Sequence, residues 1–96
     1  MERRRSQRFK TRFDTLVSAE AIEGAGVLAE ISQCGAYIED ATTRPEIGSR
    51  VTLYIFIQPV APFELVGRVA RHTDAGFAID YDLFDPEIRR LVEVAS

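Results

Sequence analysis

The sequence predicts an all-β protein, a small six-stranded antiparallel, split β-barrel with a short C-terminal α-helix and a flexible basic N-terminal arm. Short segments of alternating or β-branched composition are separated by turn-forming residues roughly every eight to twelve positions. Only the last segment has helical spacing of its apolar residues. Ninety-six residues, of which 46% are hydrophobic, allow a single domain with one modest core.

The first strand is expected at residues 13–22, where Val17 and Ala19 alternate with Ser18 and Glu20. Two glycines in residues 23–26 predict a turn after it, because glycine adopts positive φ at little cost. The sequence predicts the other strands at 27–31, 36–39, 51–57, 63–71 and 77–81. The strongest of these signals is 51–57, which is rich in β-branched and aromatic residues.

The chain is expected to end in a short amphipathic helix. Asp85 is a helix N-cap residue and Pro86 suits the first helical position. Ile88, Leu91 and Val92 fall on one face at spacings of three and four residues. The predicted organisation is therefore one domain over 1–96, with a basic arm at 1–12, a barrel at 13–84 and a helix at 85–95.

Charge is distributed unevenly along the chain. Residues 2–13 hold six of the twelve Lys and Arg residues and one acid, a formal charge of +5. The remaining residues hold six bases and fourteen acids, so their charge is −8 and the net charge is −3. A basic arm on an acidic body predicts an anionic partner. Extended nucleic acid is not expected, because most of the surface would repel it.

Catalytic chemistry finds little support in the sequence. Cys34 and His72 are the only residues of their kinds, and they form neither a zinc site nor a Cys–His pair. No phosphate-binding glycine loop opens a helix. We expect a protein that is not an enzyme and has no metal, cofactor or membrane-inserted segment. The single cysteine is typical of a protein of the reducing cytoplasm.

Two short patterns point to ligand binding. Arg3, Arg4 and Arg8 form Arg-Arg-x-x-x-Arg, and guanidinium groups bind phosphate oxygens and the O6 and N7 acceptors of guanine. In residues 30–35, the Glu30 carboxylate can accept from guanine N1–H and N2–H₂. Ser32 can serve a ligand or the backbone, and Gly35 permits a close turn. The bland alternative is that Ser32 and Gly35 only form a hairpin turn.

Together these patterns resemble the PilZ domain, a bacterial receptor module for cyclic di-GMP. Its signatures are Arg-x-x-x-Arg in an N-terminal arm and Asp/Asn-x-Ser-x-x-Gly at a turn between early strands. This chain has Arg4-Arg5-Ser6-Gln7-Arg8, preceded by Arg3, and Glu30 to Gly35. The resemblance continues through residues 67–71 and 75–81 into the final helix. It implies a six-stranded barrel that holds the nucleotide on its outer surface under the arm.

The resemblance implies a non-catalytic cyclic di-GMP receptor that acts on a downstream protein partner through ordering of its arm. The expected ligand-binding residues are Arg3, Arg4, Arg8, Glu30, Ser32 and Gly35. Arg71, on a late strand, could face the same surface, although a solvated side chain is favoured. Glu30 stands where the family has Asp or Asn, so its carboxylate extends one methylene further. The alternative is therefore an adaptor that binds proteins but no nucleotide. A weaker alternative is an oligonucleotide-binding barrel, which few exposed aromatic residues support.

Overall fold

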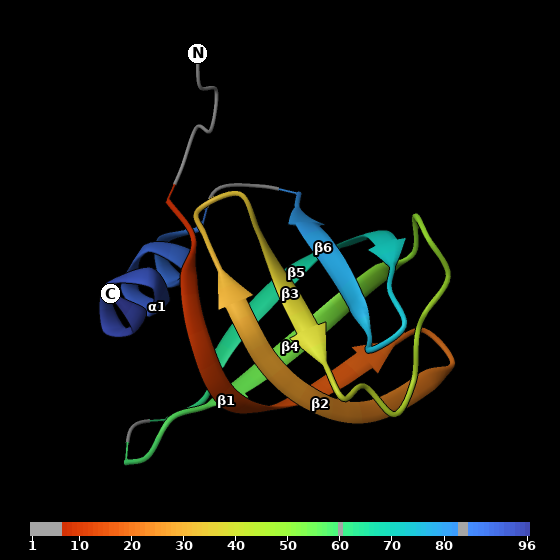
Figure 1. Ribbon diagram of the computed structural model, residues 1–96, viewed down its shortest axis with the longest axis horizontal. Helices are drawn as coiled ribbons and strands as arrows, with labels where there is room; N and C mark the ends of the chain where they lie inside the picture. Colours follow the sequence, from red (N-terminus) through yellow and green to blue (C-terminus); the bar gives the residue numbers. More distant parts are fainter. Residues whose placement is uncertain (1–6, 60, 83–84) are drawn as a thin grey trace.

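The structure is a computed structural model, and it describes residues 7–59, 61–82 and 85–96. Six antiparallel strands form a closed barrel in the order β1-β2-β3-β6-β5-β4, with one helix beside it (Figure 1). The strands are β1 (Phe9–Ala19), β2 (Ile22–Ile31), β3 (Gly35–Glu39), β4 (Arg50–Phe56), β5 (Phe63–His72) and β6 (Phe77–Tyr81). This architecture confirms the predicted fold class.

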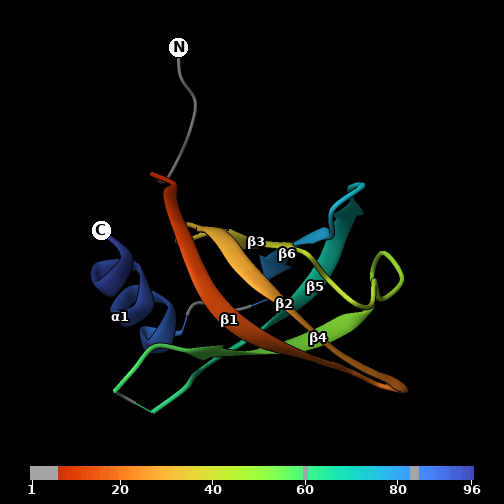
Figure 2. The same ribbon diagram turned by 60° about the horizontal axis from the view of Figure 1, so that its bottom comes forward.

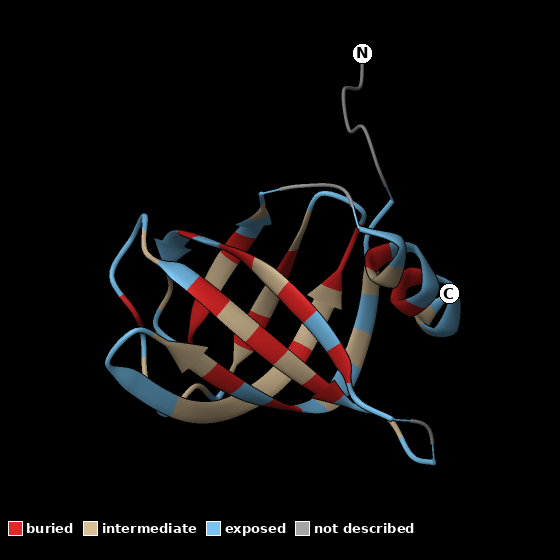
Figure 3. Ribbon diagram, turned by 180° about the vertical axis from the view of Figure 1, so that it is seen from behind, coloured by how far each residue is buried: buried red, intermediate tan, exposed pale blue. Residues whose placement is uncertain are grey.

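The barrel interior is filled by side chains that alternate along each strand. In β4, Val51, Leu53 and Ile55 are buried and the residues between them are more exposed. The same alternation runs through β5 as far as Val69, and Figure 3 shows it along the strands. Because every second residue faces the core, the intervening residues form an outer surface that is free to carry polar chemistry.

Helix α1 (Pro86–Ala95) packs against β1 and β5 beside the start of β1 (Figure 2). Ile88, Leu91 and Val92 are buried and join the barrel core. At the N-terminus of the helix, the Asp85 side chain accepts a hydrogen bond from the Glu87 amide at 2.9 Å. The predicted cap, first-position proline and apolar face are all confirmed.

The position predicted for the turn of the first hairpin is wrong. Ala19 pairs with Ile22, so the chain reverses at residues 20–21, and the predicted turn at 23–26 lies within β2. Position 24 requires glycine for lack of space, because a Cβ there would lie 2.6 Å from both Thr42 Oγ1 and Thr43 Cγ2. The first strand also begins at Phe9, four residues before the expected start at Phe13.

A first prediction concerns the cap of α1, where the Asp85 side chain satisfies one of the amides at the helix N-terminus. Asp85→Ala should lower the free energy of unfolding by about 0.5–2 kcal/mol, because the Glu87 amide loses its acceptor. Asp85→Asn retains an acceptor and should recover most of this loss. Urea unfolding of the three proteins measures the effect. Equal stability of the Ala variant and the wild type would contradict the capping role.

Candidate functional site

The turn between β2 and β3 is organised by the side chain of Ser32. Its Oγ accepts hydrogen bonds from the amides of Cys34 at 3.1 Å and Gly35 at 3.2 Å. The Ser32 amide donates to the Gly35 carbonyl at 3.0 Å, and the residue is buried, with 7% of its surface exposed. The hydroxyl therefore serves the backbone, and it shapes the pocket wall by holding residues 32–35 in a tight turn.

Gly35 brings this turn against β6. It pairs with Asp80, and a Cβ at position 35 would lie 2.3 Å from the Ile79 carbonyl oxygen. The Tyr81 hydroxyl donates to the Gly35 carbonyl at 3.2 Å. Burial, followed by the nearby Cys34 thiol, raises the pKa of the Tyr81 phenol, so this hydroxyl remains a donor. Gly35 is thus required for the close approach of β3 and β6 that forms the pocket floor.

Three β-bulges lie at one level of the barrel, next to this turn. The register shifts between Lys10 and Phe13 in β1, between Leu28 and Glu30 in β2, and between Val69 and Arg71 in β5. The Thr11 hydroxyl donates to the Leu28 carbonyl at 2.6 Å at the first of them. A bulge adds one residue and reverses the faces of the side chains that follow it.

The bulges align one transverse row on the outer face, here called the outer row. It consists of paired residues from five neighbouring strands: Lys10, Glu30, Tyr37, Ala78 and Arg71. Without the shifts, Glu30 and Arg71 would follow the buried residues Leu28 and Val69 into the core. The outer row thus combines a carboxylate, an aromatic ring and two cations on one surface.

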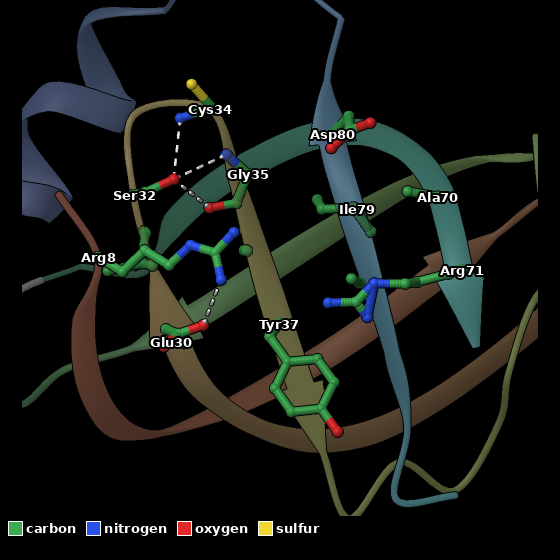
Figure 4. A pocket seen from close by; sticks show the side chains of 13 residues that line it. Arg8, Glu30, Ser32, Cys34, Gly35, Tyr37, Ala70, Arg71, Ile79 and Asp80 are labelled. Atoms are coloured by element: carbon green, nitrogen blue, oxygen red, sulfur yellow. Dashed lines mark hydrogen bonds and ion pairs between the residues drawn. The ribbon is translucent and has the colours of Figure 1, made fainter. Parts of the chain in front are cut away.

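Arg8, which directly precedes β1, lies over this surface. Its Nη1 is 3.7 Å from Glu30 Oε1, and the two side chains are 56% and 32% exposed (Figure 4). An ion pair this long and this exposed contributes only about 0–1 kcal/mol. The pair therefore orients both side chains, but it is weak enough that each can exchange its partner for another group.

These residues surround a pocket of about 180 Å³. Four of the six predicted ligand residues line it: Arg8, Glu30, Ser32 and Gly35. The other two, Arg3 and Arg4, lie outside the described residues. The rest of the lining comes from the strands around the turn: Ile31, Cys34, Ala36, Tyr37, Ala70, Arg71, Ala78, Ile79 and Asp80.

Tyr37 and Arg71 also line the pocket, although the sequence did not single out Tyr37 and favoured a solvated position for Arg71. The outward position of the Tyr37 side chain follows from the alternation of β3, in which Ala36 and Ile38 are buried. Its hydroxyl lies 2.7 Å from Thr73 Oγ1, and this hydrogen bond fixes the ring. Arg71 was expected to be solvated. It is exposed, but it lines the pocket and points from β5 over β6 toward the pocket centre (Figure 4). The bulge that re-aims Arg71 has no simple sequence signal.

The groups in the pocket suit binding better than catalysis. Guanidinium groups offer forked donors, Glu30 offers two acceptor oxygens, and Tyr37 offers an aromatic face. His72 is engaged elsewhere, with its Nε2 2.7 Å from the Pro45 carbonyl oxygen. Over the described ranges, no group of three or more His, Cys, Asp or Glu side chains is arranged to hold a metal ion. No helix in those ranges is long and apolar enough to cross a membrane.

A small closed barrel with a polar pocket on its outer wall defines a ligand-binding module. The PilZ domain model matches residues 2–94, and the chain belongs to the PilZ domain family, whose members are generally non-catalytic binding domains. No curated protein shows significant sequence similarity to the chain.

Two of the solved structures that match the chain show the shared fold. The PilZ domain of CeSA from a cellulose-synthesizing bacterium has a TM-score of 0.79 at 17% identity, over 93% of this chain and 97% of that one. The Bacillus subtilis inhibitor of motility (MotI/DgrA) has a TM-score of 0.78 at 16% identity, over 99% of this chain. The chain spans about half the length of that inhibitor, 50%.

A second prediction concerns Ser32. Ser32→Ala should lower the free energy of unfolding by about 1–3 kcal/mol, because two backbone amides of the turn lose their acceptor. Denaturant unfolding measures the change. Ser18→Ala is a matched control, since the Ser18 hydroxyl makes no hydrogen bond with the described residues and its removal should have little effect. Equal losses in the two variants would refute the organising role of Ser32.

Proposed function

We propose that this chain is a non-catalytic cyclic di-GMP receptor domain that acts in the bacterial cytoplasm on a downstream protein. The observation that carries the proposal is that Arg8, Glu30 and the Ser32–Gly35 turn line one pocket on the outside of the barrel. These residues come from two motifs more than twenty positions apart in the sequence. Membership of the PilZ family, a known family of cyclic di-GMP receptors, supports the same ligand.

The chemistry of the pocket favours guanine. Glu30 supplies two acceptor oxygens for guanine N1–H and N2–H₂, whereas adenine presents an acceptor at N1. Arg8 supplies forked donors for a phosphate or for the O6 and N7 acceptors of guanine. Ser32 and Gly35 contribute through the shape of the pocket, because they set the position of the wall against which the ligand would lie.

The Arg8–Glu30 pair does not prevent binding. Separating it costs at most about 1 kcal/mol, because both side chains are substantially exposed. Each charge-assisted hydrogen bond to the ligand contributes about 1.5–3 kcal/mol. Two such bonds at Glu30 alone outweigh the lost pair, so a guanine displaces Arg8 from Glu30 and leaves the guanidinium free for a phosphate.

Arg3 and Arg4 extend the same chemistry along the basic arm. With Arg8 they provide three guanidinium groups for a ligand that carries two phosphates and two guanines. Ordering of the arm over the bound ligand would change the surface offered to a partner protein. The names of the two structural neighbours make control of motility or of polysaccharide synthesis the proposed outputs.

A nucleotide-independent adaptor is the second candidate. It is favoured by one observation: Glu30 replaces the family's Asp or Asn, and its longer side chain already contacts Arg8. In this case the pair is a surface feature and the basic arm is a docking segment for an acidic partner.

The third prediction tests whether the chain binds cyclic di-GMP as proposed. Calorimetric titration with cyclic di-GMP at physiological salt should show binding at micromolar concentration or tighter, with no comparable binding of GTP. Arg8→Ala or Arg4→Ala should abolish it, because a phosphate or guanine contact is lost. Arg50→Ala, an exposed arginine on β4, should bind as the wild type does.

Thermal unfolding of the same variants separates binding from folding, because Arg8 is exposed and its replacement should leave the midpoint nearly unchanged. Full affinity of the Arg8→Ala protein would refute the assigned pocket. No heat from folded wild-type protein at high micromolar ligand would favour the adaptor.

The fourth prediction concerns base selectivity. Glu30→Gln replaces one acceptor oxygen by a donor amide, which suits adenine better than guanine. The variant should bind cyclic di-GMP about ten- to a hundredfold more weakly, and its preference over cyclic di-AMP should shrink. Glu30→Asp should retain the preference for guanine. Unchanged selectivity in the Gln variant would show that Glu30 does not contact the base.

A further inference from the structure

Arg71 occupies its place in the pocket because of a local departure from strand regularity. Phe63, Leu65 and Val69 of β5 are buried at every second position, which would direct Arg71 into the core. The register instead runs from the pair Val69–Ile79 to the pair Arg71–Ala78, so Ala70 is the extra residue of a bulge. The bulge turns Arg71 outward at the level of the outer row.

The surroundings of Arg71 leave its guanidinium available. Arg8 is paired with Glu30, Arg68 with Asp82, and Arg90 with Glu87. The Arg71 guanidinium, by contrast, has no ion pair or hydrogen bond with any described residue. Ala70 and Ala78 are small, and they leave room beside it in the pocket lining. Figure 4 shows the side chain extending over β6 toward Tyr37 instead of away from the barrel.

Arg71 lies across the pocket from Arg8 and Glu30. Three strand steps separate Glu30 on β2 from Arg71 on β5, a backbone separation of roughly 14 Å along the sheet at the usual strand spacing. The ring of Tyr37 lies between them in the outer row. A ligand whose base lies at Glu30 therefore needs a further anionic or purine group that extends past Tyr37 to contact Arg71.

We propose that Arg71 is a ligand-binding residue that contacts the second half of a cyclic dinucleotide, through its phosphate or the acceptor edge of its second guanine, and so selects the dinucleotide over a mononucleotide. This inference rests on the proposed function. It adds to that function a specificity determinant on β5, outside both sequence motifs. A guanidinium is suited to this role, because its fork matches both phosphate oxygens and guanine O6 and N7.

The test compares two probes, cyclic di-GMP and GMP, by NMR titration of the full chain. Arg71→Ala should weaken cyclic di-GMP binding about ten- to a hundredfold and leave GMP binding unchanged. Arg71→Lys keeps the charge without the fork and should give an intermediate loss. Arg50→Ala is the matched control for loss of one exposed positive charge. In the wild type, the amides of residues 70 and 78 should shift with cyclic di-GMP much more than with GMP.

The outcomes distinguish this inference from the function on which it rests. Wild-type affinity for cyclic di-GMP in the Arg71→Ala protein overturns the role of Arg71 and leaves the receptor proposal in place. Equal weakening of both probes, matched by Arg50→Ala, reduces Arg71 to a general electrostatic contribution and also overturns it. A wild-type chain that binds neither probe overturns both proposals together.

Discussion

The pocket depends on one constraint, the exclusion of charge from a small closed barrel. Glu30 follows buried Leu28 by two residues, and Arg71 follows buried Val69 by two residues. A regular strand would place both charges in the core, at a cost of several kcal/mol for each unpaired ion. One extra residue in each strand avoids this cost and turns both side chains to the same outer row. The bulges that keep Glu30 and Arg71 out of the core therefore also place both side chains at the pocket.

Separation of the two faces keeps folding and recognition largely independent. The core consists of apolar side chains from all six strands and α1, and no pocket cation or carboxylate reaches it. Arg8 and Glu30 are exposed enough that replacing them leaves the core packing intact. Ser32 and Gly35 are different, because they hold the β2–β3 turn against β6. Replacement of Glu30 is thus expected to leave the fold intact, and in the proposed function its effect falls on ligand binding.

Much of the fold could be predicted from the sequence, since strand alternation and the Asp85-Pro86 helix start are local signals. The first hairpin could not, because Gly24 reads as a turn residue while its real requirement is space beside Thr42 and Thr43. For the candidate site, the motifs selected Arg8, Glu30, Ser32 and Gly35, and these four residues line one pocket. The outward position of Tyr37 follows from the alternation of β3, but its place beside the other pocket residues depends on pairing between distant strands. The outward position of Arg71 depends on a bulge, which no local pattern specifies.

Charge also decides what kind of ligand suits this surface. The body outside residues 2–13 has a formal charge of −8, so a long polyanion that extended beyond the pocket would meet net repulsion. A compact ligand with two phosphates stays within reach of the arginines and avoids the acidic surface. Glu30 adds a further requirement: any occupant must offer hydrogen-bond donors to it, or else bring an anion close to an uncompensated carboxylate. Phosphate alone fails this requirement, whereas a guanine nucleotide satisfies Glu30 through its base and Arg8 through its phosphate. In the proposed function, such a ligand would replace the weak Arg8–Glu30 pair by contacting both side chains at once.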